Sequence, residues 1–381
     1  MAEIKNLKKA AKRIAKAVKN KERIILYGDA DLDGASSVII LEEAIKNLGG
    51  KVSAVYFPDR ETEGHGITET GLEFLKDKAP ALLVAVDCGI GNFKEVKLAQ
   101  KLGFEVIIVD HHEILDELPE ANIIVDPKQK GDKYPFKKLA AAGLVFKLIE
   151  VLLKKKMTES LRRNFLELVA LATLADMMPR EADNEIFIEE GLPSLGKTFR
   201  PGISIFLEEE IIRNLPSLNQ KVSKIISILN IRDIEDRLPA SFRLLTSPTP
   251  EKVKEIIKKL LEKNKLRKEK IEVMVQEVEN KILNKSEPVI FEGNSSFEMI
   301  LMSSVASIIC KEYQKPTFIY KKMEEESQGT VRTPADINSV ALMKKCSECL
   351  LTFGGHPQAS GFRIKNENLE KFKECLIKNS R

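Results

Sequence analysis

The first third of the chain alternates between short apolar runs and stretches with helical periodicity, and this alternation limits the fold more than any other feature. The apolar runs are typical of buried strands and cover residues 23–28, 51–57, 81–87, 104–110 and 122–126. Helical patterns separate the first four, over about residues 35–48, 68–78 and 92–102. Strands that alternate with helices form parallel sheets covered on both faces. We therefore predict an α/β domain with a doubly wound parallel sheet.

The remainder of the chain predicts a helical linker and a second, smaller α/β domain. Two helices are expected within residues 138–178, and the apolar spacing over 251–285 fits one long amphipathic helix. Lysines and glutamates balance on that helix, so we expect a solvated face rather than a nucleic-acid-binding stripe. A strand-like run near Pro288 opens a second α/β pattern, which closes with a helix near 367–379. We place the first domain at 1–190, the linker at 191–286 and the smaller domain at 287–381.

Charge and cysteine content limit the binding partners and the cellular compartment that we expect for this chain. The 61 basic and 57 acidic residues give a net charge of +4, so any charge that binds nucleic acid must be local. Five scattered cysteines argue against a disulfide framework and for a reducing compartment, and we expect a cytoplasmic protein without a membrane partner. Cys346 and Cys349 lack the four ligands of a zinc site, so we expect two unpaired thiols there. The basic N-terminal helix lacks the apolar core of a secretory signal. We expect it to pack on its own domain.

Carboxylates and imidazoles follow three of the predicted strands directly. They are Asp29, Asp31 and Asp33 after the first strand, Asp87 at the end of the third, and Asp110, His111 and His112 at the end of the fourth. Because ligands of open α/β sheets bind outside the carboxyl ends of the strands, these groups should converge on one place. Their mixture suits a divalent metal such as Mn²⁺, with Mg²⁺ as the alternative. Two such ions about 3.5–4 Å apart are a known device for phosphoryl transfer.

Each motif has a simpler interpretation when it is taken alone. The spacing of Asp29, Asp31 and Asp33 resembles a calcium loop, but Ile40 stands where that loop needs glutamate. Asp87 could cap a helix, and residues 110–112 could form a polar turn. Three such motifs at the ends of three separate strands favour a shared metal site. Asp176 interrupts an apolar helical run, so it is either a metal ligand or a solvent-facing residue at the end of a helix.

A glycine–histidine segment near the C-terminus is the second candidate site. Gly354 and Gly355 precede His356 and would allow a ligand to approach the backbone closely. Backbone N–H groups beside an imidazole can hold a phosphate or a nucleobase. Arg332, just upstream, could bind a phosphate in a bidentate manner, or it could be an ordinary surface arginine.

These segments, in this order, resemble the DHH phosphoesterase superfamily, and within it the RecJ-like exonucleases that act on single strands. The resemblance spans nearly the whole chain. Its four DHH motifs are similar to GDADLDG (28–34), VDCGIG (86–91), VDHH (109–112) and LADMMP (174–179). The glycine–histidine motif of a DHHA1-type domain is similar to FGGHPQASGF (353–362), and RecJ-like segments include PDRETEGHGI (58–67).

The resemblance implies roles for these residues. It implies two Mn²⁺ ions held mainly by Asp31, Asp33, Asp87, His111 and Asp176, with Asp87 as the bridging ligand. Further ligands or orienting groups would be Asp29, Asp110 and His112, and the reaction itself would depend on Asp87, His111 and His112. Phosphates or sugar would be bound across an interdomain cleft by Arg332, Gly354, Gly355 and His356.

The chain departs from the family pattern in three places. His65 stands where the family usually has tyrosine, so it receives no role, and threonines rather than serines flank Arg332. Bacterial RecJ adds an oligonucleotide-binding fold, whereas this chain resembles a short, archaeal-like form. We expect an exonuclease acting on single-stranded DNA or RNA in replication or repair, with replisome proteins as further partners. The alternatives are a phosphodiesterase for nanoRNA or cyclic dinucleotides and a catalytically silent replisome scaffold.

Overall fold

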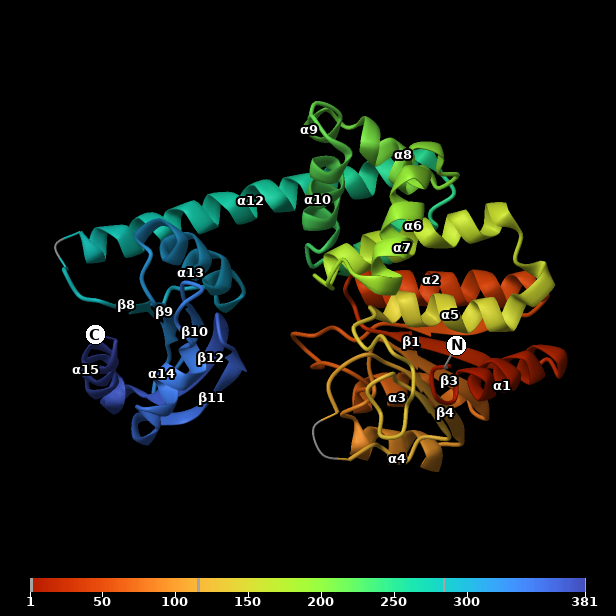
Figure 1. The fold of residues 1–381 in the computed structure, drawn as a ribbon, viewed down its shortest axis with the longest axis horizontal. Coiled ribbons are helices and arrows are strands. Elements are labelled where there is room, and N and C mark those ends of the chain that lie inside the picture. Colours follow the sequence, from red (N-terminus) through yellow and green to blue (C-terminus); the bar gives the residue numbers. More distant parts are fainter. Residues whose placement is uncertain (1–2, 115–116, 284, 381) are drawn as a thin grey trace. The chain divides into compact units, whose positions relative to one another are not determined.

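The chain forms two compact units in the computed structural model, which describes residues 3–114, 117–283 and 285–380. The division falls after Leu261 (Figure 1). Among the described residues, no helix has both the length and the apolar character needed to cross a membrane.

A five-stranded parallel sheet forms the centre of the first unit (Figure 1). Its strand order is β2-β1-β3-β4-β5, so the chain runs from β1 to one edge and then back past β1 to the other. The register pairs Ile24 of β1 with Leu82 of β3, and Val109 of β4 with Val125 of β5. The predicted doubly wound sheet is confirmed. The strands are β1 (Ile24–Gly28), β2 (Val52–Tyr56), β3 (Ala81–Val86), β4 (Phe104–Val109) and β5 (Ile123–Val125).

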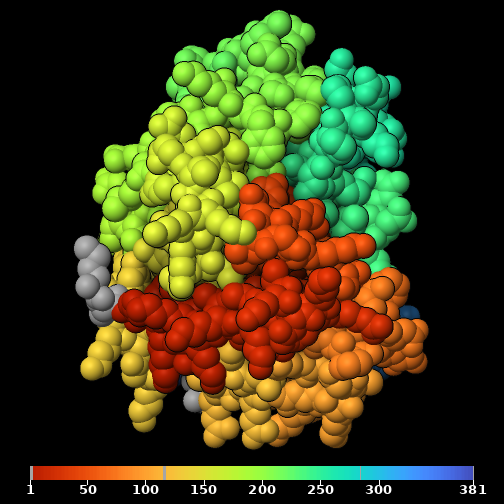
Figure 2. All heavy atoms as spheres, turned by 90° about the vertical axis from the view of Figure 1, so that its right-hand side faces the viewer, coloured from red at the N-terminus to blue at the C-terminus, as the bar shows by residue number. Residues whose placement is uncertain are grey.

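Helices cover both faces of this sheet because successive strand residues point to opposite faces. Alternate strand residues such as Leu26 and Val84 join one core with three of the helices, and Tyr27 and Leu83 join a second core with the other two. The first face carries α1 (Leu7–Lys19), α2 (Leu32–Asn47) and α5 (Ala141–Leu153), and the second carries α3 (Glu69–Leu75) and α4 (Phe93–Lys101). The N-terminal helix packs on its own domain as predicted, and its segment (red) lies across one side of the unit in Figure 2.

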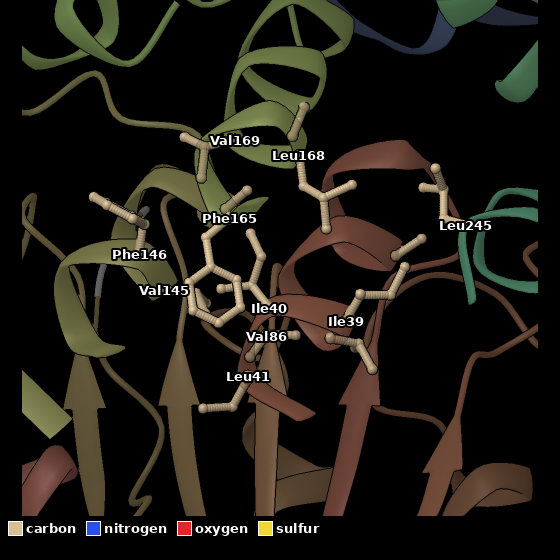
Figure 3. Close-up of a cluster of buried hydrophobic side chains, with 14 of the residues drawn as sticks. Ile39, Ile40, Leu41, Val86, Val145, Phe146, Phe165, Leu168, Val169 and Leu245 are labelled. Atoms are coloured by element: carbon tan, nitrogen blue, oxygen red, sulfur yellow. The ribbon is translucent and has the colours of Figure 1, made fainter. Parts of the chain in front are cut away.

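The larger core also includes helices that follow the sheet. Figure 3 shows where side chains of α2, α5, α6 (Glu159–Ala175) and α11 (Ala240–Thr246) meet above β3. Phe146, Phe165 and Ile40 are fully buried there, and each such side chain contributes about 1.5–3 kcal/mol by leaving water.

The segment predicted as a linker is mainly helical, and its buried apolar side chains as far as Leu260 belong to this same core. Our proposed boundaries at residues 190 and 286 therefore differ from the division into compact units at Leu261. The remaining elements of the segment are α7 (Ala182–Gly191), α8 (Pro201–Glu208), α9 (Glu210–Arg213), α10 (Leu218–Leu229), a hairpin of β6 (Ile234–Glu235) and β7 (Leu238–Pro239), and the long α12 (Pro250–Ile282).

The second unit is a smaller α/β structure, as predicted, with a mixed five-stranded sheet in the order β11-β12-β10-β9-β8. β8 and β9 are parallel, and the other neighbours are antiparallel. Its strands are β8 (Ile290–Asn294), β9 (Thr317–Lys322), β10 (Glu326–Arg332), β11 (Leu350–His356) and β12 (Ala359–Lys365). Its helices after α12 are α13 (Met299–Tyr313), α14 (Ser339–Lys344) and α15 (Leu369–Asn379).

Short 3-10 helices occur in both units. In the first unit they lie at Lys76–Lys78, Lys154–Lys156 and Leu192–Lys197, and in the second at Ser347–Cys349 and Asn366–Asn368.

A disulfide joins Cys346 to Cys375 in this unit. Our expectation of an unpaired thiol is therefore wrong for Cys346, although Cys349 is free and buried. Cysteine count and spacing could not reveal the pair, because the two residues lie 29 positions apart and only the fold brings their Cα atoms to 5.9 Å.

Candidate metal centre

The candidate metal ligands lie where the parallel strands of the first unit end, and the turn after β1 is built around three aspartates. Asp31 is the N-cap of α2 and accepts a hydrogen bond from the backbone N–H of Gly34 (3.0 Å). Gly34 must be glycine, because a Cβ there would lie 2.3 Å from the carbonyl oxygen of Asp29. The helix can therefore begin directly against the strand, which holds Asp33 in its first turn.

Asp87 follows β3 in a left-handed backbone conformation with φ of 59°. Aspartate and asparagine tolerate this conformation better than other residues that have a Cβ. Its N–H donates to the carbonyl oxygen of Val109 on β4 (3.0 Å), which continues the sheet pairing by one residue. The backbone thus fixes Asp87 at the carboxyl end of β3, beside the residues that follow β4.

His111 lies within a few ångströms of three carboxylates. Its Nε2 atom is 3.2 Å from Asp87 Oδ1, 3.6 Å from Asp176 Oδ2 and 3.9 Å from Asp33 Oδ2. Three sets of side chains have ligand atoms within 4.8 Å of one another, and Asp87 and His111 each belong to two of these sets. They are Asp87 with His111 and His112, Asp33 with His111 and Asp176, and Asp29 with Asp31 and Asp87.

Too few positively charged side chains surround the central carboxylates to neutralise their charge. Burial, followed by repulsion from neighbouring carboxylates, raises the pKa of Asp33 and of Asp87 well above the usual range. The two oxygens of Asp33 accept hydrogen bonds from the backbone N–H groups of Ala141 and Ala142 at the start of α5 (2.7 and 2.8 Å). Aspartates with uncompensated charge beside a neutral imidazole form a donor set that fits divalent metal ions.

Asp176 is the C-cap of α6, and the structure brings it to this cluster. Its Oδ2 atom is buried without a hydrogen-bond partner, and burial together with the charge of Asp31 raises the pKa of Asp176 to about 6. The interpretation of Asp176 as a solvent-facing helix end is therefore not supported by its position.

The two adjacent histidines have opposite electrostatic environments. Burial and the charge of His112 lower the pKa of His111 to about 4, so His111 is neutral at pH 7 and can donate a lone pair to a metal. The hydrogen bond that His112 Nδ1 donates to Asp110 Oδ1 (2.7 Å) raises the pKa of His112 to about 9. Burial favours a higher pKa for Asp110, but the bonds to His112 and to the N–H of Ile90 outweigh it and lower the pKa. Asp110 thus orients the ring of His112, as carboxylates beside metal-binding histidines do, and the Nε2 atom of His112 can bind a metal once it gives up its proton.

Two residues of this region were missed by the sequence analysis. The guanidinium of Arg60 donates to Asp29 Oδ1 (2.8 Å) and to Asp31 Oδ2 (2.8 Å), so it partly neutralises the turn after β1. Asp126 follows β5 and is completely buried, with its Oδ2 atom unpartnered, and burial raises its pKa to about 7. The rule that chemistry gathers after strand ends could have found Asp126, but nothing in the sequence pairs Arg60 with the aspartates.

The second unit brings its candidate residues to one end of its sheet. Arg332 ends β10, His356 ends β11, and both pair with Ala359 of the intervening strand β12. Gly355 has φ of 132°, and a Cβ there would lie 2.7 Å from the carbonyl oxygen of Ala359, so the turn requires glycine. His356 and Gly354 are exposed, while Arg332 is partly buried and donates to Thr330 Oγ1 (3.1 Å). His65 is exposed in the loop between β2 and α3.

The fold and this cluster place the chain among DHH-type proteins. Residues 23–173 match the DHH family, N-terminal domain, and residues 286–379 match the DHHA1 domain. The chain therefore belongs to the DHH family.

Within that family the chain is similar to RecJ. It is 32% identical to the single-stranded-DNA-specific exonuclease RecJ of Bacillus subtilis over 387 residues, which cover 98% of this chain and 48% of that protein. RecJ of Thermus thermophilus is 26% identical over 97% of this chain and 54% of its own length. The chain thus spans about half the length of these curated relatives.

Solved RecJ structures share the fold. An exonuclease RecJ bound to manganese superposes with a TM-score of 0.78 at 25% identity, covering 99% of this chain and 95% of the other. RecJ from Thermus thermophilus in complex with Mn²⁺ also gives 0.78, at 24% identity, over 99% of this chain and 55% of that one.

Proposed function

We propose that this chain is a metal-dependent exonuclease of RecJ type, which hydrolyses single-stranded DNA to mononucleotides during DNA replication or repair. The observation that carries the proposal is the convergence of Asp33, Asp87 and Asp176 within 3.9 Å of the Nε2 atom of His111. Relatives named single-stranded-DNA-specific exonucleases match the chain across both domains, which supports this substrate.

We propose two Mn²⁺ ions, with Mg²⁺ as the alternative, and Asp87 as the ligand common to both. The main ligands would be Asp31, Asp33, Asp87, His111 and Asp176, supported by Asp29 and His112. When bound, such a pair supplies an activated water and stabilises the oxygen that leaves. Asp110 holds the ring of His112, and the N–H groups of α5 hold the carboxylate of Asp33, so both side chains are positioned before a metal binds.

The second unit is proposed to position the strand. Arg332 offers a planar cation for a phosphate of the strand, and that phosphate can approach the backbone around Gly354 and Gly355 closely. His356 adds an exposed imidazole at the same end of the sheet. These residues would bind substrate and leave the chemistry to the carboxylate cluster.

The alternative functions are less well supported. A phosphodiesterase for nanoRNA or cyclic dinucleotides is not favoured, because the relatives that match both domains are named single-strand DNA exonucleases. A silent scaffold could lose its metal ligands, whereas this chain keeps a carboxylate or histidine at each position of the cluster. Replisome proteins are proposed as partners.

The proposal is tested by digestion of single-stranded DNA and RNA labelled at either end, in the presence of chelator, Mn²⁺ or Mg²⁺. We expect DNA digestion only with metal, and the labelled end that is released first gives the polarity. A dinucleotide serves as the comparison substrate. Turnover in excess chelator would exclude the metal mechanism, and cleavage confined to the dinucleotide would exclude the exonuclease.

A further inference from the structure

The middle of α12 carries a concentration of positive charge that the function described above does not use. Residues 258–270 contain seven lysine and arginine residues and two glutamates, a net charge of +5. Because the whole chain carries +4, all its other residues together carry −1. The overall balance of lysine and glutamate along the helix conceals this local excess.

Four of these cations form a stripe, which we define as Lys259, Lys263, Arg267 and Lys270. At 3.6 residues per turn they fall within an arc of about 80°, and they extend over about 16 Å of the helix. Lys259 and Lys270 have 47% and 57% of their side chains exposed, Lys263 is exposed, and Arg267 is half-buried. Leu266, 57% exposed, stands beside the stripe and offers an apolar surface.

The spacing within the stripe is unfavourable for the helix alone. Lys259 and Lys263, and then Lys263 and Arg267, stand four residues apart, and Arg267 and Lys270 stand three apart. Like charges at these spacings destabilise a helix by about 0.2–0.5 kcal/mol per pair. Lys259 and Lys281 each contact a glutamate four residues before them, Glu255 (3.1 Å) and Glu277 (2.8 Å), which offsets part of this cost. A polyanion bound along the stripe would lower the repulsion between its cations further.

The acidic contacts of Lys259 and Lys270 are ones that a phosphate can replace. Lys259 lies 3.1 Å from Glu255 and 3.9 Å from Glu235, and Lys270 lies 2.7 Å from Glu298. All three pairs are exposed, and exposed pairs contribute only about 0–1 kcal/mol each. Arg267 donates to the hydroxyl of Ser304 (3.2 Å), a neutral partner that leaves its charge available.

We propose that this stripe binds the phosphate backbone of single-stranded DNA at nucleotides that are not being cleaved. The inference rests on the proposed function and adds a binding surface to it. Steps of about 6 Å between cations suit an extended strand, and a positively charged track that follows the backbone is a common feature of proteins that bind single strands. A membrane surface does not fit, because the apolar face of α12 is already buried through residues such as Val253 and Val278.

The test is the salt dependence of binding to a fluorescent oligothymidylate in chelator, where the strand is not cut. The variant carries Lys263→Gln, Arg267→Gln and Lys270→Gln, and glutamine keeps a good helix propensity. Each phosphate contact to a single strand contributes about 0.7 to the slope of log affinity against log salt. We expect the slope to fall by roughly 2 in magnitude. The matched control removes three exposed lysines elsewhere, with Lys154→Gln, Lys155→Gln and Lys156→Gln, and should keep the wild-type slope.

Two further measurements separate this inference from the proposed function. Digestion of a dinucleotide with Mn²⁺ should be unchanged in the stripe variant, whereas digestion of a long strand at elevated salt should slow. The charge-conserving variant Lys263→Arg, Arg267→Lys, Lys270→Arg should keep the wild-type slope. The single variants Lys263→Gln, Arg267→Gln and Lys270→Gln, each expected to lower the slope by about 0.7, replace the triple variant if it impairs folding. The proposed binding role of the stripe would be wrong if the glutamine variant kept the wild-type slope. It would also be wrong if the slope fell equally in the lysine control, or if it fell in the charge-conserving variant. A wild-type protein that binds strands with the expected slope but never cuts them would overturn only the proposed function.

Discussion

At the scale of single residues, the candidate metal centre is positioned by backbone groups at the ends of strands and helices. Asp33 is held by two N–H groups of α5, and Asp110 by the N–H of Ile90. Asp87 is placed by its left-handed backbone conformation. These contacts keep buried carboxylates together although they repel one another, which costs stability until a cation binds.

The first prediction concerns Asp87, the proposed bridging ligand. We expect Asp87→Asn to lower the rate of hydrolysis by more than about a hundredfold and to weaken metal binding, because a neutral amide cannot replace a shared carboxylate. The metal-free protein should become more stable, since a buried group whose pKa is raised destabilises the fold when it is ionised. Asparagine is preferred to alanine here because it tolerates positive φ. Rates, metal titration and urea unfolding in chelator would be measured, and a near-normal rate would contradict the assignment.

The second prediction concerns His356, which is exposed at the end of β11. We expect His356→Ala to weaken strand binding and to slow hydrolysis by up to about a hundredfold through misplacement of the phosphate. Residual activity should remain, and metal titration should match that of the wild type. Substitution of the exposed His65 by alanine is the control and should change neither quantity. If His356→Ala lost a metal ion, the division between chemistry and positioning would be wrong.

At the scale of secondary-structure elements, a buried ionic network joins three helices of the first unit. Arg200 is the N-cap residue of α8 and is only 2% exposed. Its guanidinium donates to Glu43 of α2 through two nitrogens (2.8 Å each) and to Glu167 of α6 (2.9 Å). Burial raises the pKa of Glu167 to about 7 even with this partner, so the network depends on the arginine.

The third prediction is that Arg200→Met lowers the free energy of unfolding of the first unit by about 3–5 kcal/mol, because it leaves two carboxylates without their cation. Part of that loss should return when Glu167→Gln is added, since the buried negative charge is then removed. Arg200→Lys should be intermediate, because lysine cannot reproduce the planar pair of contacts to Glu43. Urea unfolding followed by circular dichroism measures all three, and a loss below about 1 kcal/mol for Arg200→Met would show that the network contributes little.

At the scale of the whole molecule, each unit has hydrophobic cores of its own, and the metal cluster described above belongs entirely to the first. A ligand that binds only the folded state stabilises the part of the chain that holds it. Metal binding and stability should therefore be coupled in one unit and not in the other.

The fourth prediction is that Mn²⁺ raises the temperature at which the first unit unfolds and leaves the second unit unchanged. At a hundred times the dissociation constant the stabilisation should be about 2.7 kcal/mol. The effect should shrink as the pH falls from 7 to 5, because Asp176, whose pKa is raised to about 6, must lose its proton to bind metal. Scanning calorimetry with Mn²⁺ and with chelator resolves the two transitions. A shift in the second unit alone, or a larger effect at pH 5, would contradict this location of the metal.

Much of the fold and most of the candidate cluster could be predicted from the sequence. The apolar runs that became β1, β3, β4 and β5 are continuous because a covered parallel sheet is buried on both faces, whereas the edge strand β2 is only partly buried, and this pattern is local. Asp29, Asp87 and Asp110 each follow such a strand, so parallel topology alone brings them to the same end of the sheet, where the strands have their carboxyl ends. Periodicity likewise located α12 within a few residues of its bounds.

Only the tertiary structure decided the remaining features, because each depends on segments whose separation in sequence carries no distance information. Arg60 reaches Asp29 across 31 positions, and Cys346 reaches Cys375 across 29. The position of Asp176 beside His111 follows from the packing of α6 over the sheet, which no periodicity specifies. Local patterns state which face of an element is buried, whereas long-range contacts are set by how whole elements pack, and these contacts complete the site.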